Sequence, residues 1–217
     1  MTGLAGRHAL VTGASRGIGA AIARRLLDEG AAVTLLARTK PSLQGLSGRT
    51  FAVAADVRDE TAVTVAIGAA RTANGPIDIL INNAGGAVSA PFARHESQLV
   101  RGMLELNLVS VFLLTRLVLP SMVARGWGRV VNVASTAGLK GYPYVSAYCA
   151  AKHGVVGLTR ALAHETARTG VTVNAVCPGY VDTGMLDAAA QEVAGKTGRD
   201  PGDIREGLAA ANPGGRL

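Results

Sequence analysis

The stretch RHALVTGASRGIGAAIARRLLDEGAAVTLLAR, residues 7–38, decides the fold class of the chain. It starts with a short apolar run that ends at a glycine turn, and apolar residues at helical spacing follow at Ile18, Ile22 and Leu26. That pattern stops at Gly30, a residue typical of the end of a helix, and a second apolar run begins directly after it. The stretch therefore predicts a strand, a helix and a second strand, which together form a βαβ unit.

The alternation of apolar runs with helical segments continues through most of the chain. Four further strands are predicted at 50–57, 77–85, 128–135 and 171–179, and long helices at 59–75, 96–124 and 146–169. The strand segments are apolar on both faces, which is typical of a parallel sheet covered by helices on each side. The sequence therefore predicts the α/β class and a doubly wound parallel sheet, the Rossmann fold, in a single domain of residues 1–217.

Composition and charge narrow the range of functions. The 217 residues carry a formal net charge of +7, and 48% of them are hydrophobic, enough for a large core. Lysines and arginines are scattered along the chain and form no basic run. We therefore expect a small anionic ligand such as a phosphate, and no nucleic acid.

The sequence shows no pattern for export, membrane insertion or metal binding. The N-terminus lacks a signal-peptide pattern, and the most apolar stretch, 103–120, is interrupted by Glu105 and Arg116, so we expect a buried or interface helix there. Cys149 and Cys177 lack metal-ligand spacing, and no cluster of His, Cys and Asp suggests a metal. We therefore predict reduced thiols, a cytoplasmic protein, no metal and no membrane contact.

The turn between the first strand and the first helix reads TGASRGIG, residues 12–19. Gly13, Gly17 and Gly19 let the backbone turn sharply and let an anion approach the helix N-terminus, where free N–H groups and the helix dipole favour negative charge. A glycine trio alone is a weak signal, but its place inside a βαβ unit predicts a loop that binds a pyrophosphate.

Two arginines predict which dinucleotide binds. The second strand ends at Arg38, where an Asp or Glu would hold the ribose hydroxyls of NAD, whereas an Arg accommodates the 2′-phosphate of NADP. Arg16 lies inside the loop, within reach of the same phosphate. The pair therefore predicts NADP(H) as the cofactor.

Five motifs in order resemble the short-chain dehydrogenases/reductases: TGASRGIG, NNAG at 82–85, Asn107, Ser135 and YCAAK at 148–152. The match covers residues 6–185, and the sequence looks closest to reductases of 3-oxoacyl thioesters and polyketides. The resemblance implies a catalytic tetrad of Asn107, Ser135, Tyr148 and Lys152. It implies cofactor contacts for Tyr148 and Lys152 and for a further set: Gly13, Ser15, Arg16, Gly17, Ile18, Gly19, Arg38, Asp56, Val57, Asn83, Ala84, Gly85, Pro178, Gly179 and Thr183.

Within that set, the resemblance assigns each group of residues to one part of the cofactor. Residues 13 and 15–19 would line the phosphates and the ribose, and Asp56 and Val57 would flank the adenine. Residues 83–85 would support the cofactor and the central sheet, and Pro178, Gly179 and Thr183 would border the nicotinamide.

The residue types and the spacing of the tetrad also predict a chemical role for each side chain. Tyr148 and Lys152 are spaced i,i+4 and share one face of a helix, so the ammonium is expected to lower the pKa of the phenol and make it a usable proton donor. Ser135 follows a strand and can hydrogen-bond the substrate oxygen. Asn107 lies within a predicted helix, where we expect it to hold a water that passes protons to Lys152.

The predicted reaction is hydride transfer from NADPH to the carbonyl carbon of a ketone, with Tyr148 as the general acid. The preferred substrate is a 3-oxoacyl thioester, carried by CoA or by an acyl carrier protein, or a polyketide-like ketone. Two alternatives stay open: an NAD(P)-dependent dehydrogenase of a steroid, a sugar or another secondary alcohol, and a non-catalytic dinucleotide-binding protein.

Three loops, at 86–95, 137–144 and 184–212, are expected to shape the substrate site. Its apolar walls are predicted to come from Val88, Tyr142, Tyr144, Val145 and Met185. An acidic carrier protein or a CoA phosphate is a candidate partner for the arginines Arg125, Arg129 and Arg168.

The resemblance also bears on assembly and on the end of the chain. The helices 96–124 and 146–169 are expected to pair across a two-fold axis, giving a homodimer or homotetramer. Members of the family usually continue past the segment NPGGRL, 212–217, with a helix and a final strand. We therefore expect residues 180–217 to form a substrate lid and the C-terminal end to be truncated.

Overall fold

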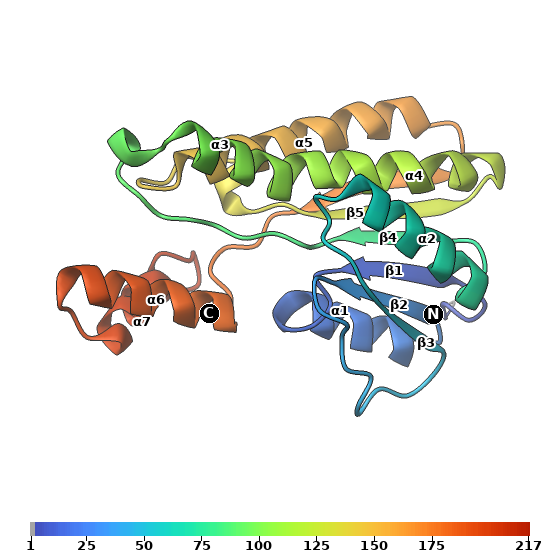
Figure 1. Cartoon of the computed structure of the whole chain (residues 1–217), viewed down its shortest axis with the longest axis horizontal. Coiled ribbons are helices and arrows are strands. Elements are labelled where there is room, and N and C mark those ends of the chain that lie inside the picture. Colours follow the sequence, from blue (N-terminus) through green and yellow to red (C-terminus); the bar gives the residue numbers. More distant parts are fainter. Residues whose placement is uncertain (1–2) are drawn as a thin grey trace. The chain divides into compact units, whose positions relative to one another are not determined.

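The core of the protein is a six-stranded parallel sheet, as a computed structural model that describes residues 3–217 shows (Figure 1). The strand order is β3-β2-β1-β4-β5-β6. The strands are β1 (His8–Thr12), β2 (Ala32–Ala37), β3 (Thr50–Ala54), β4 (Ile79–Asn82), β5 (Gly128–Val133) and β6 (Val171–Val176). This confirms the predicted fold class and all six predicted strands.

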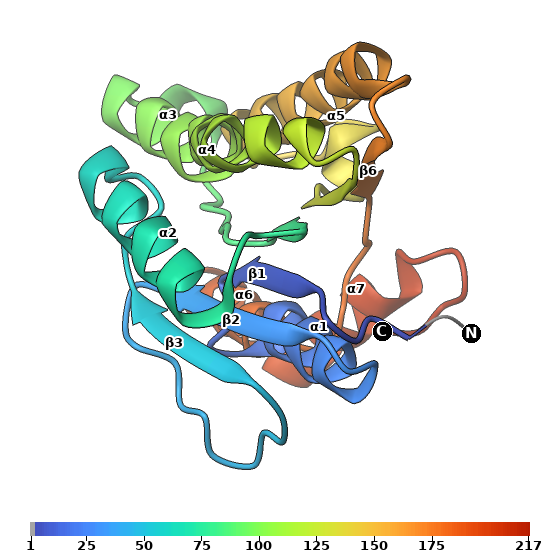
Figure 2. The same cartoon turned by 90° about the vertical axis from the view of Figure 1, so that its right-hand side faces the viewer.

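Helices cover both faces of the sheet, and each face has its own apolar cluster. On one face, Leu10, Leu80 and Val130 pack against α2 (Glu60–Asn74) and α4 (Ser110–Ala124). On the other, Val11 and Leu35 pack against Ala23 and Leu27 of α1 (Gly17–Asp28). Figure 2 shows α1 on the opposite side of the strands from α2 and α4. The alternation of neighbouring strand residues between two faces explains why the strands read as continuous apolar runs.

The order of the strands reverses direction between β1 and β4. β1 pairs with β2 on one side and with β4 on the other, so the loops that leave these two strands separate at their carboxyl ends. In open parallel sheets, this switch point is where a ligand binds. The predicted phosphate loop leaves β1 at this point.

The predicted helix 96–124 is two helices joined by a π-helical turn. α3 (Ser97–Leu104) leads into the turn at Glu105–Val109, and α4 continues to Ala124. An 18-residue window within the 97–124 segment has a mean hydropathy of 1.8. By length and composition the segment could cross a membrane, but the core helix of a globular domain has the same properties. Inserted π turns occur frequently at functional sites, and this one carries Asn107.

The chain divides into two compact units, the first ending at Cys177 and the second spanning Pro178–Leu217. The first unit also contains α5 (Ser146–Thr166), which packs on β6. The second unit contains α6 (Gly184–Thr197) and α7 (Pro201–Ala210). Arg205 joins these helices through ion pairs with Asp182 and Asp187. The single domain with a lid from residue 180 stays a prediction.

Candidate active site at the carboxyl ends of the strands

The glycine loop has the shape that an anion site needs. Gly13 and Gly17 adopt positive φ angles of 65° and 57°, which side chains disfavour. A Cβ on Gly19 would lie 2.4 Å from the carbonyl oxygen of Gly13, so α1 packs against the strand only because that residue is glycine. Arg16, the N-cap of α1, makes no capping hydrogen bond through its side chain. The first N–H groups of the helix are thus left for another acceptor, and the loop fits a pyrophosphate.

Asn83 and Thr12 lock the two strands together at the switch point. Asn83 Nδ2 donates to the carbonyl oxygen of Thr12 at 2.9 Å, and the N–H groups of Asn83 and Ala84 both donate to Thr12 Oγ1 at 3.0 Å. The structure thus gives Asn83 and Ala84 the sheet-supporting role expected of them. Thr12, the first residue of the loop motif, was not predicted as a site residue. A Thr at the end of a strand indicates no special role until its hydrogen-bond partners are known.

Charged side chains gather at the carboxyl ends of β2 and β3. The side-chain hydrogen bond from Arg58 is the largest influence that lowers the pKa of Asp56, to about 2, and the charge of Arg38 lowers it as well. Asp56 is therefore ionised and already paired with Arg58 at 2.6 Å. Val57 is buried in the core, and its predicted place beside the adenine stays a prediction.

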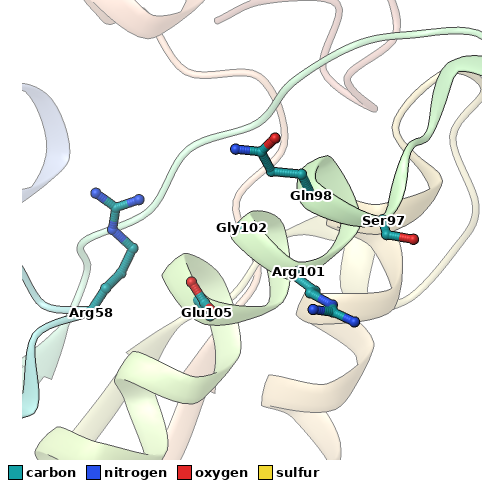
Figure 3. A pocket seen from close by; sticks show the side chains of 6 residues that line it. All are labelled: Arg58, Ser97, Gln98, Arg101, Gly102 and Glu105. Atoms are coloured by element: carbon teal, nitrogen blue, oxygen red, sulfur yellow. The ribbon is translucent and has the colours of Figure 1, made fainter.

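A pocket of about 610 Å³ lies beside this cluster, between Arg58 and α3. Figure 3 shows its lining residues Arg58, Ser97, Gln98, Arg101, Gly102 and Glu105, with the Arg101 side chain directed away from Arg58. None of the four predicted catalytic residues lines this pocket. The predicted catalytic groups therefore lie outside the lining of this pocket.

Ser135 and Tyr148 meet at the carboxyl end of β5. Ser135 lies two residues beyond the end of that strand, and its Oγ accepts a hydrogen bond from the backbone N–H of Ala137 at 3.1 Å. Tyr148 lies in the first turn of α5, and its phenol is close enough to the Ser135 hydroxyl for that group to lower its pKa. The two hydroxyl groups thus form one polar patch on an otherwise half-buried surface.

Lys152 is buried below the ring of Tyr148. Its side chain is 5% exposed, its Nζ lies 5.7 Å from the centre of the tyrosine ring, and it donates to the carbonyl oxygen of Val133 at 2.8 Å. Burial lowers the pKa of the ammonium to about 8, and the nearby Cys177 raises it slightly. The i,i+4 spacing therefore brings the two groups together as predicted.

The expected effect of Lys152 on Tyr148 is not what the structure shows. Burial is the largest influence and raises the pKa of the phenol above its ordinary value, while the neighbouring Ser135 hydroxyl opposes that rise. The ammonium is directed toward Val133 and lies against the face of the tyrosine ring. It therefore stabilises the phenolate oxygen less than the sequence spacing suggests. Tyr148 is thus held in its protonated form, the form that a proton donor needs.

Asn107 closes the site from the α3–α4 side. Its Oδ1 accepts from the N–H of Gly86 at 3.1 Å, and its Nδ2 donates to the carbonyl oxygen of Gly86 at 2.9 Å. A Cβ on Gly85 would lie 2.8 Å from Asn107 Oδ1 and 3.6 Å from Lys152 Nζ. Gly85 therefore keeps the space between Asn107 and Lys152 open, and the predicted water relay between them stays a prediction.

A buried polar chain that the sequence did not reveal links the helices below the site. Asn82 and Asn132 are register partners on β4 and β5, and Asn82 Nδ2 donates to Asn132 Oδ1 at 2.9 Å. Thr115 of α4 accepts from Asn82, and Thr159 of α5 accepts from Asn132. No motif marks these residues, because each is an ordinary polar residue until the fold brings it to its partner.

Two other sets of predicted residues are not part of the tetrad. Pro178, Gly179 and Thr183 belong to the second unit, where Thr183 is the N-cap of α6, and their place beside the nicotinamide stays a prediction. The remaining set is the three arginines expected to meet a carrier protein: Arg125, Arg129 and Arg168.

Those three arginines lie at the wrong end of the sheet for this role. Arg125 donates to Ile77 just before β4, and Arg129 starts β5 and donates to the carbonyl oxygen of Gly170. Arg168 follows α5 and precedes β6. All three thus mark the amino ends of the strands, whereas Ser135 follows a carboxyl end. Scattered arginines carry no sign of which end they will occupy until the strand direction is known.

The chain is similar to oxidoreductases across most of its length. The family described as short chain dehydrogenase, adh_short, matches residues 7–194. The ketoacyl reductase HetN of Nostoc is 42% identical over 85% of this chain and 67% of its own length. A putative ketoacyl reductase of granaticin polyketide synthesis from Streptomyces violaceoruber is 45% identical over 86% of this chain and 72% of its own.

Solved structures agree with the sequence match. A variant actinorhodin polyketide ketoreductase with NADPH superimposes with a TM-score of 0.90 at 39% identity, covering 97% of this chain and 84% of that one. Levodione reductase superimposes with a TM-score of 0.91 at 32% identity, covering 98% and 85%. With the glycine loop, the locked switch point and the Ser135–Tyr148–Lys152 arrangement in place, the chain belongs to the short-chain dehydrogenase family of oxidoreductases.

Proposed function

We propose that the protein is an NADPH-dependent reductase of ketones, with Tyr148 as the proton donor. The observation that carries this proposal is the position of the Tyr148 phenol, with the Ser135 hydroxyl beside it and the Nζ of the buried Lys152 5.7 Å from the centre of its ring. Because burial holds the phenol protonated, Tyr148 can give a proton to a carbonyl oxygen that gains negative charge.

Each side chain of the tetrad has a distinct task in this proposal. NADPH, when bound in the glycine loop, supplies the hydride to the carbonyl carbon. Ser135 donates a hydrogen bond to the substrate oxygen and orients it toward Tyr148. Lys152 places a positive charge beneath the tyrosine ring, which stabilises the phenolate after proton transfer. Asn107 holds the strand-to-helix loop through Gly86 and keeps the floor of the site in position.

The preference for NADPH over NADH rests on the charge around β2 and β3. Arg38 is exposed at the end of β2, and the nearby carboxylate of Asp56 is already paired with Arg58. A 2′-phosphate would thus meet Arg38 without an opposing free acid, and Arg16 of the loop is exposed as well. The ketoreductase relative solved with NADPH supports the same choice.

The substrate that we propose is a 3-oxoacyl thioester or a polyketide-like ketone. Support comes from the relatives named as ketoacyl reductases and from the similar solved structure of a polyketide ketoreductase. The exposed apolar side chains Val88, Phe92 and Tyr144 on the loops near the tetrad fit a substrate with an apolar chain.

The test is a titration with NADPH and NADH, followed by turnover of a 3-oxoacyl-CoA with Tyr148→Phe as the control. We expect tighter binding of NADPH and loss of turnover in the variant with binding retained. Tighter binding of NADH would refute the cofactor assignment, and undiminished turnover by Tyr148→Phe would refute the mechanism.

The helices α4 and α5 carry a groove that we propose to be the subunit interface of a dimer or tetramer. The groove has a volume of about 710 Å³ and is apolar along most of its length, with Val109, Phe112, Leu119, Leu158 and Leu162 in its lining. Phe112 and Val109 are about half exposed, more than large apolar side chains on a helix face usually are. A second copy, with the same face, would cover them.

A further inference from the structure

Two loops that are far apart in the sequence are joined beside the tetrad. His95 Nε2 lies 3.1 Å from the carbonyl oxygen of Ala90, and His95 Nδ1 lies 3.0 Å from Ser146 Oγ. The N–H of Ala90 donates to the carbonyl oxygen of Tyr144 at 2.8 Å. The loop after β4 and the segment that starts α5 are thus connected at two points. Figure 1 shows both segments at the N-terminal ends of α3 and α5.

The chemistry of the partners defines the state of the histidine ring. A carbonyl oxygen only accepts, so Nε2 carries the proton and donates to Ala90. In the neutral imidazole, Nδ1 then accepts a hydrogen bond from the hydroxyl of Ser146. Both ring nitrogens are therefore occupied, and the imidazole is a rigid bridge between the loop 86–95 and the first residue of α5.

The backbone on the other side of the bridge is strained. Tyr144 has a φ of 66°, and among residues 3–217 it is the one non-glycine residue with a positive φ. A bulky side chain is unfavourable in this left-handed region, and such residues persist where the surrounding structure holds them and cluster at functional sites. Here the holding contact is the hydrogen bond from Ala90, on the loop that His95 anchors.

The joined loops present apolar side chains to solvent. Phe92 is 80% exposed, Tyr144 is 62% exposed, and the ring of Phe92 lies 5.9 Å from that of His95. Ser146 is two residues before Tyr148 on the same helix. The bridge therefore holds an apolar rim next to the proton donor, where the far end of a substrate would lie.

We propose that His95 is a positioning residue that latches the loop 86–95 to α5 and so selects substrates with a long apolar chain. This proposal rests on the proposed function, because the apolar rim would contact the chain of the same ketone substrate that the tetrad reduces. His95 does not touch the reacting atoms. Its effect should fall on KM for large substrates and little on kcat.

The kinetic test compares acetoacetyl-CoA with 3-oxododecanoyl-CoA in wild type, His95→Ala and Ser146→Ala. We expect KM for the long thioester to rise about tenfold in both variants, the effect of losing a hydrogen-bonded contact. KM for the short thioester and the Kd of NADPH should change by less than about twofold, a difference no larger than the usual deviation between independent sites. In the double variant, the rise should be no larger than in His95→Ala alone, because the two side chains form one bridge.

His164→Ala is the matched control, because it removes a histidine from the exposed end of α5 and should leave every value unchanged. Equal changes in KM for both thioesters, or additive effects of the two variants, would overturn the proposal.

A second measurement decides the latch without any substrate. Amide hydrogen exchange of the 86–95 segment should be faster by about tenfold or more in His95→Ala and Ser146→Ala, because the loop opens more often. Unchanged exchange would overturn the latch. If the wild type reduces neither thioester, the proposed substrate fails while the exchange result still stands, and the size comparison is made with a large and a small ketone that the protein does reduce.

Discussion

The ammonium nitrogen of Lys152 donates a hydrogen bond to the carbonyl oxygen of Val133 at 2.8 Å, which anchors the lysine of α5 on the strand that leads to Ser135. The contact joins the two elements that carry the site. It also fixes the ammonium below the tyrosine ring, in a place where burial disfavours its charge.

Lys152→Met should abolish activity while leaving the fold intact. Burial lowers the pKa of Lys152 from 10.5 to about 8 in the folded protein, so between these values the unfolded chain binds more protons and stability rises with pH. Below pH 8 the folded state carries the full cost of the buried charge, on the order of 3 kcal/mol. The variant should therefore match or exceed the wild-type free energy of unfolding at pH 7, and lose the rise between pH 8 and 10.5.

Urea unfolding at several pH values measures this difference, and turnover should fall at least about a hundredfold. A variant that is less stable than wild type at pH 7 by several kcal/mol would show that the lysine stabilises the fold.

Tyr148→Phe should lower turnover about a thousandfold or more while leaving the Kd of NADPH within a few-fold, because the lost group acts on the proton and not on the cofactor. The raised pKa adds a spectroscopic test: the phenol of Tyr148 should ionise above pH 10.0 in the free protein. Ultraviolet titration of wild type minus the variant isolates this one tyrosine. A transition in the difference spectrum below pH 9 would contradict the pKa direction that burial imposes.

Arg38→Asp should shift the cofactor preference from NADPH toward NADH. The change removes a cation from the end of β2 and adds a carboxylate, which repels a 2′-phosphate and accepts hydrogen bonds from the ribose hydroxyls. We expect the Kd of NADPH to rise at least about tenfold, since a charge-assisted hydrogen bond is replaced by repulsion. Arg24→Asp, the same change on the exposed side of α1, is the control and should alter both cofactors equally.

Asn132→Ala should destabilise the protein more than its position on a central strand suggests. The substitution leaves the amide of Asn82 without its acceptor at 2.9 Å and the hydroxyl of Thr159 without its donor. Unsatisfied buried groups of this kind cost about 2–3 kcal/mol together. Asn174→Ala on β6 is the control, because that residue is exposed and should change the free energy of unfolding little. Similar effects of the two variants would mean that the buried chain contributes nothing.

Phe112→Glu should weaken the proposed subunit contact. Phe112 is 51% exposed in the α4–α5 groove, and a carboxylate there would be buried without a partner in the assembly. We expect sedimentation to shift toward the monomer. Val65→Glu places the same charge on a residue of α2 that is 68% exposed, and it should leave the assembly unchanged. A wild-type protein that sediments as a monomer would contradict the proposed contact.

Local chemistry explains why so much of the fold could be predicted. The glycine spacing, the helix end at Gly30 and the apolar runs act over a few residues, so they predicted the βαβ unit and all six strands, as the structure shows. The i,i+4 spacing of Tyr148 and Lys152 is likewise a local property, and the two groups do meet. The sequence by itself therefore determined the architecture and the identity of the catalytic candidates.

Tertiary structure alone decided the electrostatics and the long-range contacts. Whether the phenol of Tyr148 is raised or lowered in pKa depends on how much water surrounds it, and no spacing rule reports burial. Which end of the sheet an arginine reaches depends on strand direction, and so Arg125 and Arg129 lie away from the site. His95 and Ser146 are ordinary residues in the sequence, and only the packing of one loop against a distant helix makes them partners.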